Sequence, residues 1–353
     1  MLSPIKTGLV GFGVSARTFH APYFETMPEY EMVSVVERNS SFAKEKYPAI
    51  KQVRSFEDLL GDPGIELVVI TTPNETHFPY SKLALQAGKH VVVEKPFTNT
   101  SAEAMQLVEL SRNSDRILSI YHNRRYVSDF FTIREILDKK LLGEVHEFIG
   151  HYDRYRLEER PEAWREKNNP GSGILYDLGS HLIDQSLCFF GLPKNITADI
   201  RLQRPHAKVD DYFDLWLDYG FLKVILKAGM LVREPGPRYK IHGTIGSFVK
   251  YGEDPQEAKL KAGKLPVEKD FGKEPEEIYG ILHTVIDGKL VRETYPSHPG
   301  DFSAYYKNLY ATIRNGAELK EKPEQGFNTI RIIELAFESN ARKCMIRCTG
   351  LME

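Results

Sequence analysis

Cysteine is scarce in this chain, which contains only Cys188, Cys344 and Cys348 among its 353 residues. So few cysteines cannot form a disulfide framework at this length, and we expect reduced thiols. Cys344 and Cys348 lie four residues apart in a predicted terminal helix, where we expect them to serve packing. The sequence also has no Gly-x-Ser-x-Gly elbow and no Gly-x-x-x-x-Gly-Lys loop, which disfavours hydrolase and kinase functions.

Neither sign of charge is in excess. The 47 Lys and Arg residues against 49 Asp and Glu residues leave a formal charge of −2, too little to hold a phosphate backbone. Nucleic acid is therefore not an expected partner. The opening residues, MLSPIKTG, contain no apolar signal core, and no later stretch approaches the length needed to cross a bilayer. We expect a cytoplasmic protein with no membrane partner.

The length and composition, 41% hydrophobic and 27% charged, are typical of a folded chain with two domains. In the first third, apolar strand-length runs alternate with amphipathic helices. The predicted strands cover 5–10, 31–36, 66–71, 90–93 and 117–121, and the predicted helices cover 56–60, 80–87 and 102–111. Thr100 and Glu103 fit a capping box before the last helix. Residues 1–121 therefore predict a doubly wound parallel sheet, the α/β architecture of a Rossmann domain.

Residues 122–353 have a different pattern, with longer segments of alternating apolar and polar residues, and this pattern predicts an α+β domain. Alternating segments at 145–155, 196–203, 212–219 and 221–226 indicate antiparallel strands, with a hairpin turn at 218–220. A helical pattern runs from 327 to about 347. We expect one large, mainly antiparallel open sheet with helices on one face, and a second copy of the chain covering the other face.

A glycine turn follows the first strand. It has the pattern G-x-G-x-x-A and consists of Gly11, Phe12, Gly13, Val14, Ser15 and Ala16. Gly11 allows the tight turn, Gly13 lets the backbone approach a pyrophosphate, and Ala16 permits close packing of helix on strand. With a strand before it and a helix after it, the turn predicts dinucleotide binding, and a purely structural glycine turn is the alternative.

The residues after the second strand leave the choice of dinucleotide open. Glu37, 24 residues after Gly13, would accept the adenosine ribose hydroxyls of NAD. Arg38 would instead pair with the 2′-phosphate of NADP, or would simply be solvated. The coenzyme is therefore NADP or NAD.

Two further strands end in residues that can carry chemistry. Their exits present Thr72, Pro73, Asn74 and His77, and then Glu94 and Lys95 before Pro96. The carboxyl ends of parallel strands meet at the edge where ligands bind. Because Pro96 cannot continue a ladder, Lys95 lies at the strand exit, where it faces either the solvent or the site.

A second constellation lies near the middle of the chain. Asp177, His181 and Asp184 recur at offsets of four and three, which places them on one face of a helix whose other positions are apolar. This pattern predicts an imidazole tuned by carboxylates for proton transfer. A satisfied polar network at a domain interface is the alternative. The His and Cys spacings of a zinc site are missing, and we expect no metal.

These motifs occur together in one known family. The segments are GFGVSARTFHAP at 11–22, TTPNETH at 71–77, VVVEKPF at 91–97, NRRY at 123–126, WR at 164–165 and YDLGSHLIDQ at 176–185. In this order they resemble the Gfo/Idh/MocA oxidoreductases, and FHAP with NRRY resembles the scyllo-inositol dehydrogenase-like branch. The resemblance runs over nearly the whole chain.

The resemblance implies a six-stranded dinucleotide domain and a second domain whose open sheet forms homodimers or homotetramers. It implies a catalytic triad of Lys95, Asp177 and His181 and a Lys95–Pro96 peptide that is often cis. Further coenzyme contacts implied by the matching motifs are Asn123, Trp164 and Arg165. Candidate substrate contacts on the second domain, besides the triad, are Arg124, Tyr155, Arg156, Trp164, Asp184 and His283. For Tyr155 and Trp164, packing or subunit contacts are the alternative.

The activity that this implies is hydride transfer between a nicotinamide and a secondary hydroxyl of a cyclic polyol or sugar. His181 would act as general base, Asp177 would orient it or the substrate, and Lys95 would stabilise the alkoxide. Three alternatives remain at this stage: a non-catalytic sugar-sensing regulator, a glycosidase that retains its NAD, and a scaffold that binds no nicotinamide.

Overall fold

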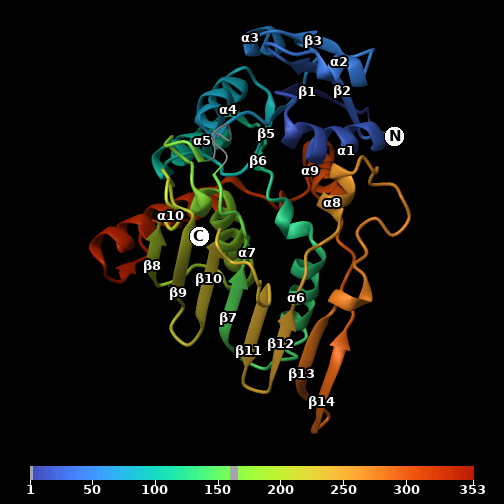
Figure 1. The fold of residues 1–353 in the computed structure, drawn as a ribbon. Coiled ribbons are helices and arrows are strands. Elements are labelled where there is room, and N and C mark those ends of the chain that lie inside the picture. The colour runs from blue at the N-terminus through green and yellow to red at the C-terminus, as the bar shows by residue number, and fades with distance from the viewer. Residues whose placement is uncertain (1–2, 160–165) are drawn as a thin grey trace. The chain divides into compact units, whose positions relative to one another are not determined.

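The computed structural model describes residues 3–159 and 166–353, and the chain forms two compact units (Figure 1). The first unit contains Met1–Asn123, Pro255–Phe271 and Asp301–Phe327. The second unit contains Arg124–Asp254, Gly272–Gly300 and Asn328–Glu353. Each unit is therefore built from three separate stretches of the chain.

A parallel six-stranded sheet forms the centre of the first unit, as the family resemblance implies; five of its strands were predicted from the sequence pattern. Its strands are β1 (Ile5–Val10), β2 (Tyr30–Val36), β3 (Lys51–Val53), β4 (Leu67–Ile70), β5 (His90–Val93) and β6 (Leu118–Ile120). The order β3-β2-β1-β4-β5-β6 places the reversal of winding between β1 and β4. Ligands of such sheets bind outside the carboxyl ends of the strands at this point.

Helical segments connect these strands. They are η1 (Ala16–His20), α1 (Ala21–Thr26), α2 (Phe42–Lys46), α3 (Phe56–Leu60), η2 (Asn74–Thr76), α4 (His77–Gln86) and α5 (Ser101–Ser114). The predicted capping box is confirmed, because the Thr100 hydroxyl accepts from the Glu103 amide and the Glu103 carboxylate accepts from the Thr100 amide. The short elements β3 and α2 were not predicted, since each is too short to show a clear period.

Helices α8 (Gln256–Lys261) and α9 (Ser303–Asn315) complete the first unit. Helix α9 contributes Tyr305 and Tyr306, both buried, and the Tyr306 ring stacks on Tyr23 with centroids 5.7 Å apart. Every residue after 121 was predicted to lie in the second domain, whereas 255–271 and 301–327 group with the first unit. An amphipathic pattern shows that a helix has an apolar side but not which sheet that side covers. The packing of 255–271 and 301–327 in the first unit could therefore not be predicted from the sequence pattern.

A nine-stranded sheet forms the second unit, in the order β14-β13-β12-β11-β7-β10-β9-β8-β15. The strands are β7 (Val145–His151), β8 (Asn195–Arg201), β9 (Tyr212–Asp218), β10 (Lys223–Gly229), β11 (Tyr239–Gly243), β12 (Gly246–Lys250), β13 (Gly280–Ile286), β14 (Lys289–Tyr295) and β15 (Ile346–Arg347). Only β7 and β10 pair in parallel, so the predicted mainly antiparallel sheet is confirmed. The β9–β10 hairpin turns at Gly220, whose φ is 98°.

Within the part of the chain that the structure describes, the two faces of this sheet differ in exposure along β9. One face buries Leu215, Leu217 and Leu226 completely, whereas Trp216 on the opposite face of β9 is 47% exposed. Among the described residues, the helical segments of this unit are η3 (Asn123–Tyr126), α6 (Ser128–Asp138), η5 (Leu175–Gly179), α7 (Ser180–Phe190), η6 (Glu276–Ile278) and α10 (Pro323–Arg342). The first residue of η3 belongs to the first unit, as do the first residues of α10.

The predicted terminal helix is too long by several residues. Helix α10 ends at Arg342, Lys343 follows with a left-handed φ of 52°, and β15 then pairs with β8. Cys344 and Cys348 therefore lie beyond the helix. Cys344 is exposed, so its predicted packing role is wrong, while burial raises the pKa of Cys348 to about 12.

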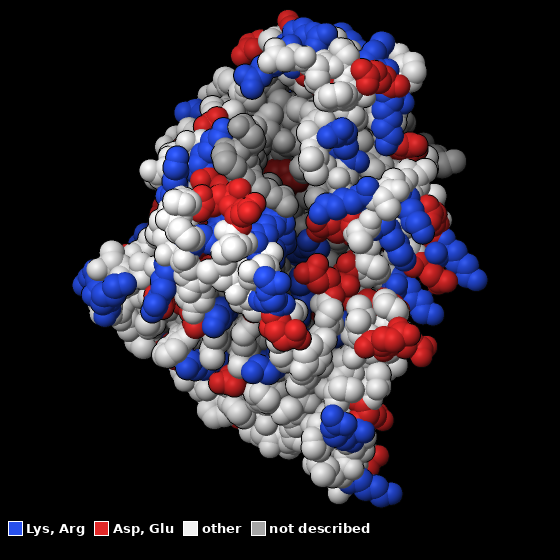
Figure 2. Space-filling model, viewed as in Figure 1, with Lys and Arg blue, Asp and Glu red and all other residues white. Residues whose placement is uncertain are grey.

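Charged side chains of both signs are interspersed over the face of the molecule shown in Figure 2. This distribution matches the near-zero net charge of the sequence. Within 3–159 and 166–353, no helix combines the length and the apolar character that crossing a membrane requires.

Candidate active site

The glycine turn has the conformation that the sequence predicts. Gly11 has a φ of 88°, and a Cβ atom there would lie 3.3 Å from both Thr71 Oγ1 and Thr72 Cγ2, so a side chain would be strained and crowded. At Gly13 an added Cβ would meet no atom within 4 Å. The backbone at Gly13 therefore borders open space into which a ligand can come close.

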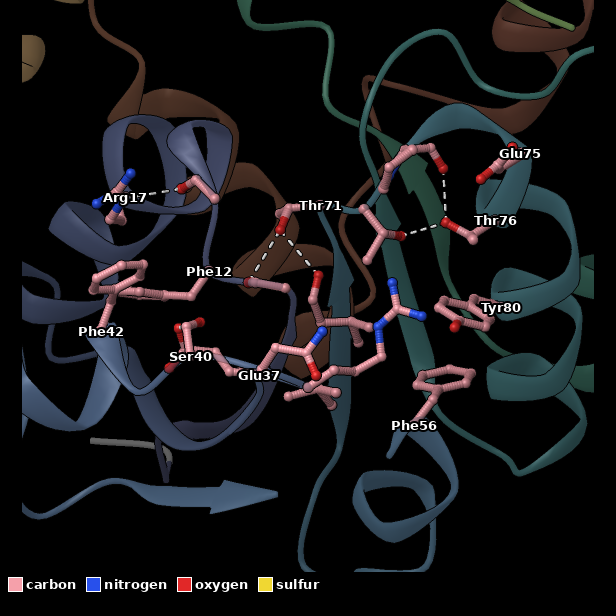
Figure 3. A pocket seen from close by; sticks show the side chains of 18 residues that line it. Phe12, Arg17, Glu37, Ser40, Phe42, Phe56, Thr71, Glu75, Thr76 and Tyr80 are labelled. Atoms are coloured by element: carbon pink, nitrogen blue, oxygen red, sulfur yellow. Dashed lines mark hydrogen bonds between the residues drawn. The ribbon is translucent and has the colours of Figure 1, made fainter. Parts of the chain in front are cut away.

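A cavity of about 460 Å³ opens beside this turn (Figure 3). It lies at the carboxyl ends of β1, β2 and β4, next to the reversal of winding. Its lining consists of Val10, Gly11, Phe12, Gly13, Arg17, Val36, Glu37, Arg38, Asn39, Ser40, Phe42, Phe56, Thr71, Thr72, Pro73, Glu75, Thr76 and Tyr80. Aromatic rings beside polar groups and an open glycine backbone fit the adenosine half of a dinucleotide.

The cavity brings together part of the predicted coenzyme set: Gly11, Phe12, Gly13, Glu37, Arg38, Thr72 and Pro73. The other described members are not in its lining: Val14, Ser15, Ala16, Asn74, His77, Glu94, Lys95 and Asn123. Trp164 and Arg165 lie outside the described residues. Arg17 and Phe42 were not predicted; they lie together in Figure 3, and the Arg17 guanidinium is 5.5 Å from the centroid of the Phe42 ring. The sequence did offer a signal for a place in the coenzyme cavity, because Arg17 comes just after the glycine turn and Phe42 comes soon after the second strand.

Glu37 is buried, with 4% of its surface exposed, although it lines the cavity. Its carboxylate accepts hydrogen bonds from Ser40 Oγ at 2.7 Å, from the Ala43 amide at 2.9 Å and from Gln52 Nε2 at 3.3 Å. These donors occupy both oxygens and hold the turn after β2. Its predicted bond to a ribose stays a prediction. Arg38, by contrast, is exposed and pairs with no acidic group among the described residues.

Glu94 lies at the exit of β5 and is bound by groups from other elements. Ser15 Oγ on the glycine turn donates to its Oε1, His20 Nε2 lies 3.0 Å from the same oxygen, and the Lys95 amide donates to Oε2 at 3.2 Å. Burial alone would raise the pKa of Glu94, but the hydrogen bonds from His20 and Ser15 and the nearby charges outweigh it and lower the pKa to about 2. Glu94 is therefore a carboxylate beside Lys95 at any working pH.

His77 is fully buried at the start of α4. Its Nδ1 lies 2.8 Å from the Pro96 carbonyl oxygen, and its Nε2 lies 3.0 Å from the Thr72 carbonyl oxygen. Burial lowers the pKa of His77, although the two backbone oxygens and Glu94 act in the opposite direction. Both ring nitrogens of His77 therefore contact backbone carbonyls, one after β5 and one after β4.

Lys95 lies between Glu94, which is bound by His20 and Ser15, and Pro96, whose carbonyl contacts His77. It is half-buried, its peptide to Pro96 is cis as the family resemblance implied, and its charge acts on both Glu94 and His77. At the exit of β5, therefore, the Lys95 amide donates to the Glu94 carboxylate, and the positive charge of Lys95 helps to lower the pKa of that carboxylate.

In the second unit, Asp177 and His181 lie on either side of a helix junction. Asp177 is part of the π-helix η5, and His181 is the second residue of α7. The Ser180 amide donates to the Leu175 carbonyl, the i to i+5 bond that widens a π-turn. The sequence pattern predicts a single α-helix here, so the π-turn is a difference from that prediction. Asp177 is half-buried and His181 is 6% exposed.

Asp184 has a different environment from the other two. Arg125 donates to both of its oxygens, Nε to Oδ2 at 2.8 Å and Nη2 to Oδ1 at 2.5 Å, and both side chains are buried. This geometry favours the satisfied polar network over a substrate contact. Gln185, the next residue, donates to the Arg124 carbonyl at 2.7 Å and accepts from Tyr239 at 2.8 Å.

The remaining substrate candidates are spread over the second unit. Tyr155 is 40% exposed and stacks under the Arg233 guanidinium, 3.8 Å from the ring centroid. Arg124 and Arg156 are half-buried. His283 is exposed on β13 and pairs in register with Ser247 and Arg292, which places it on the open sheet.

Comparison with known proteins connects these features. Residues 5–122 match the model of the oxidoreductase family's NAD-binding Rossmann fold, and residues 134–346 match that of its C-terminal alpha/beta domain. The chain belongs to the Gfo/Idh/MocA oxidoreductase family. The predicted family, fold class and NAD(P)-dependent dehydrogenase activity are thereby confirmed, and the coenzyme is NAD or NADP.

Relatives of this Gfo/Idh/MocA chain include enzymes that act on inositol and on glucosides. It is 42% identical over 339 residues to the scyllo-inositol 2-dehydrogenase (NADP(+)) IolW of Bacillus subtilis, covering 96% of this chain and 94% of the relative. It is 27% identical over 201 residues to the D-glucoside 3-dehydrogenase of Escherichia coli, covering 56% and 57%. The solved structure of oxidoreductase yvaA from Bacillus subtilis superposes with a TM-score of 0.95 at 41% identity, covering 98% and 99%.

Proposed function

We propose that this protein reversibly oxidises a secondary hydroxyl of a cyclic polyol or sugar, inositol-like in shape, with NADP as coenzyme. The observation that carries the proposal is Lys95, held at the exit of β5 beside the carboxylate of Glu94 in the coenzyme-binding unit. The names of the relatives, an inositol dehydrogenase and a glucoside dehydrogenase, support the substrate class.

Each of the three residues has a distinct role in this proposal. His181 accepts the proton of the hydroxyl as general base. Asp177, two positions before the η5–α7 junction, orients the imidazole or the substrate. The ammonium of Lys95 stabilises the developing alkoxide and passes the proton on. When bound, the nicotinamide coenzyme supplies the hydride acceptor that completes the oxidation.

NADP is favoured by the two residues that follow β2. The carboxylate of Glu37 accepts from three donors, Ser40 in the turn after β2, the Ala43 amide in α2 and Gln52 in β3, whereas Arg38 is an exposed cation in the cavity lining. A guanidinium pairs well with a phosphate, so Arg38 would hold the 2′-phosphate. The relative IolW is named as an NADP enzyme, which supports the same choice.

We further propose a cytoplasmic homodimer or homotetramer formed through the open face of the nine-stranded sheet. In register across that face lie Trp216, Ile225 and Ile149, an apolar row on neighbouring strands. A second copy of the chain would cover this row. Light scattering on the wild type and on Trp216→Glu tests this, and a monomeric wild type would contradict it.

The function is tested with a panel of inositols and aldoses, each offered with NADP and with NAD, and read by the absorbance of reduced nicotinamide. We expect turnover with a cyclic polyol and NADP. Coenzyme binding without any turnover would instead indicate a sugar-sensing regulator. Release of free sugar from a glycoside without net coenzyme reduction would indicate a glycosidase, and an absence of coenzyme binding would indicate a scaffold.

A further inference from the structure

Two buried histidines hold the residues on either side of Lys95. His20 contacts Glu94, the residue before it, and His77 contacts Pro96, the residue after it. Both histidines have 0% of their surface exposed. They come from different elements of the first unit, His20 from the end of η1 and His77 from the start of α4. The strand exit that presents Lys95 is thus held from two sides.

On one side, His20 connects Glu94 to the helix α9. Its Nε2 lies 3.0 Å from Glu94 Oε1 and its Nδ1 lies 2.5 Å from the Tyr306 hydroxyl. Because an ionised carboxylate can only accept, Nε2 carries the hydrogen, and in the neutral ring Nδ1 accepts from Tyr306. The Tyr121 ring lies against the imidazole with centroids 4.4 Å apart. His20 has therefore no ring nitrogen left for a ligand.

On the other side, His77 connects the exits of β4 and β5. Its Nδ1 faces the Pro96 carbonyl and its Nε2 faces the Thr72 carbonyl, and a carbonyl oxygen can only accept. A neutral imidazole has one N–H, and the contact to Pro96, at 2.8 Å, is the shorter of the two. His77 therefore anchors the carbonyl of Pro96, the residue after Lys95.

We propose that His20 and His77 are positioning residues that fix the Glu94–Lys95–Pro96 segment and thereby set the place of the Lys95 ammonium. Neither histidine touches coenzyme or substrate in this account. The inference rests on the proposed function, since it concerns the lysine that handles the alkoxide there. A displacement of about 1 Å in a reacting group can reduce turnover on the order of 100-fold, so such anchors matter for catalysis.

Asparagine and glutamine substitutions separate the two nitrogens of each ring. The amide nitrogen of asparagine reaches the position of Nδ1, and that of glutamine reaches the position of Nε2. At position 20, glutamine keeps the bond to Glu94 and asparagine loses it. At position 77, asparagine keeps the bond to Pro96 and glutamine loses it. Each variant is thus the matched control of the other.

The proposal predicts a crossed pattern. His20→Asn and His77→Gln should lower kcat roughly 10- to 100-fold, whereas His20→Gln and His77→Asn should lower it by about threefold at most. The dissociation constant for NADPH, measured by fluorescence, should stay within about threefold in all four variants. If the variants lowered kcat only by destabilising the fold, both substitutions at a given position would lower it to a similar extent, whichever hydrogen bond they keep. The same amino acid being harmful at both positions would overturn the proposal.

A second readout does not depend on turnover. We would acetylate the coenzyme-free protein with an amine reagent and quantify Lys95 modification by mass spectrometry, relative to the exposed Lys51. Modification of Lys95 should rise by roughly threefold or more in His20→Asn and His77→Gln only, because a loosened segment exposes its side chain. Should His20→Asn not fold, Tyr306→Phe removes the other partner of His20 and should raise Lys95 modification in the same way.

The two readouts distinguish the failure of each proposal. A wild type that turns over no polyol would contradict the proposed function, while the acetylation pattern would still test the two histidines. A wild type that turns over normally, with acetylation and kcat unaffected by His20→Asn and His77→Gln, would overturn the positioning role alone.

Discussion

Arg125 and Asp184 form a bidentate ion pair inside the second unit, with side chains 7% and 2% exposed. The pair fixes α7, the helix that carries His181, to η3. Removing one partner of a buried pair leaves an uncompensated charge, which typically costs about 3–5 kcal/mol.

Replacing this carboxylate should therefore destabilise the fold. We expect Asp184→Ala to lower the free energy of unfolding by roughly 3 kcal/mol or more in urea titrations. Asp199→Ala is the matched control, since Asp199 pairs with Arg201 on the surface and should cost about 1 kcal/mol at most. If both variants lost the same small free energy of unfolding, the ion pair with Arg125 would not stabilise the fold, and Asp184 would remain a candidate substrate contact.

The choice of coenzyme should depend on Arg38. Loss of a charge-assisted hydrogen bond to phosphate costs about 1.5–3 kcal/mol, so Arg38→Ala should weaken NADPH binding roughly 10- to 100-fold and leave NADH binding nearly unchanged. Arg17→Ala, which removes the other arginine of the cavity lining, serves as control and should not discriminate between the coenzymes. Fluorescence titration measures both. Loss of NADH binding in Arg38→Ala would contradict the assignment.

Glu94 should contribute to stability above acidic pH. Its pKa in the fold is about 2 against an ordinary value of 4.5, so the ionised form stabilises the fold at neutral pH and this contribution is lost as the pH falls from 4.5 toward 2. We expect Glu94→Gln to be less stable at pH 7, on the order of 3 kcal/mol, with the gap narrowing at pH 3. Exposed Glu57→Gln is the control. A gap that widens on acidification would show the opposite sign.

Asp129 should affect stability with the opposite pH dependence, because its pKa is raised in the fold whereas that of Glu94 is lowered. Burial raises its pKa to about 6, although Arg238 and Lys250 oppose this and Asp254 and Glu274 add to it. Because the folded pKa lies above the ordinary value of 3.8, the stabilising contribution is complete below pH 3.8 and is lost as the pH rises through 6.

The variant Asp129→Asn tests this second pH effect. At pH 8 it should be more stable than the wild type, on the order of 3 kcal/mol, and near pH 4 the two should be similar. Exposed Asp138→Asn should show neither change. Thermal unfolding at several pH values measures the difference, and a variant that is less stable at pH 8 would refute the expectation.

Much of the fold could be predicted from local patterns. The bounds of β1, β5 and α3 follow from apolar runs and the turns beside them, because burial on both faces leaves a clear sequence signature. The return of α9 to the first unit could not be predicted, since the fit of Tyr305 and Tyr306 against β6 and α1 is a tertiary event. The π-turns η1 and η5 were missed for a similar reason: an i to i+5 bond has no sequence period of its own.

The candidate site was predicted in its residue types more than in its contacts. The glycine turn and Lys95 could be placed because backbone constraints and strand ends are local. The assignment of His77 and Ser15 to the coenzyme stays a prediction, while their contacts within the protein, His77 with backbone carbonyls and Ser15 with Glu94, were not predicted. A polar side chain near a strand exit has several partners within reach, and only the folded chain selects among them.

The central claim is that the first unit binds a nicotinamide coenzyme and that Lys95 then assists hydride transfer from a polyol hydroxyl. A single-turnover experiment with Lys95→Met, saturating NADP and the preferred polyol tests it most directly. We predict a rate of nicotinamide reduction at least about 100-fold below that of the wild type, together with a much smaller loss of coenzyme affinity. A variant that reduces the coenzyme at the wild-type rate would contradict the account.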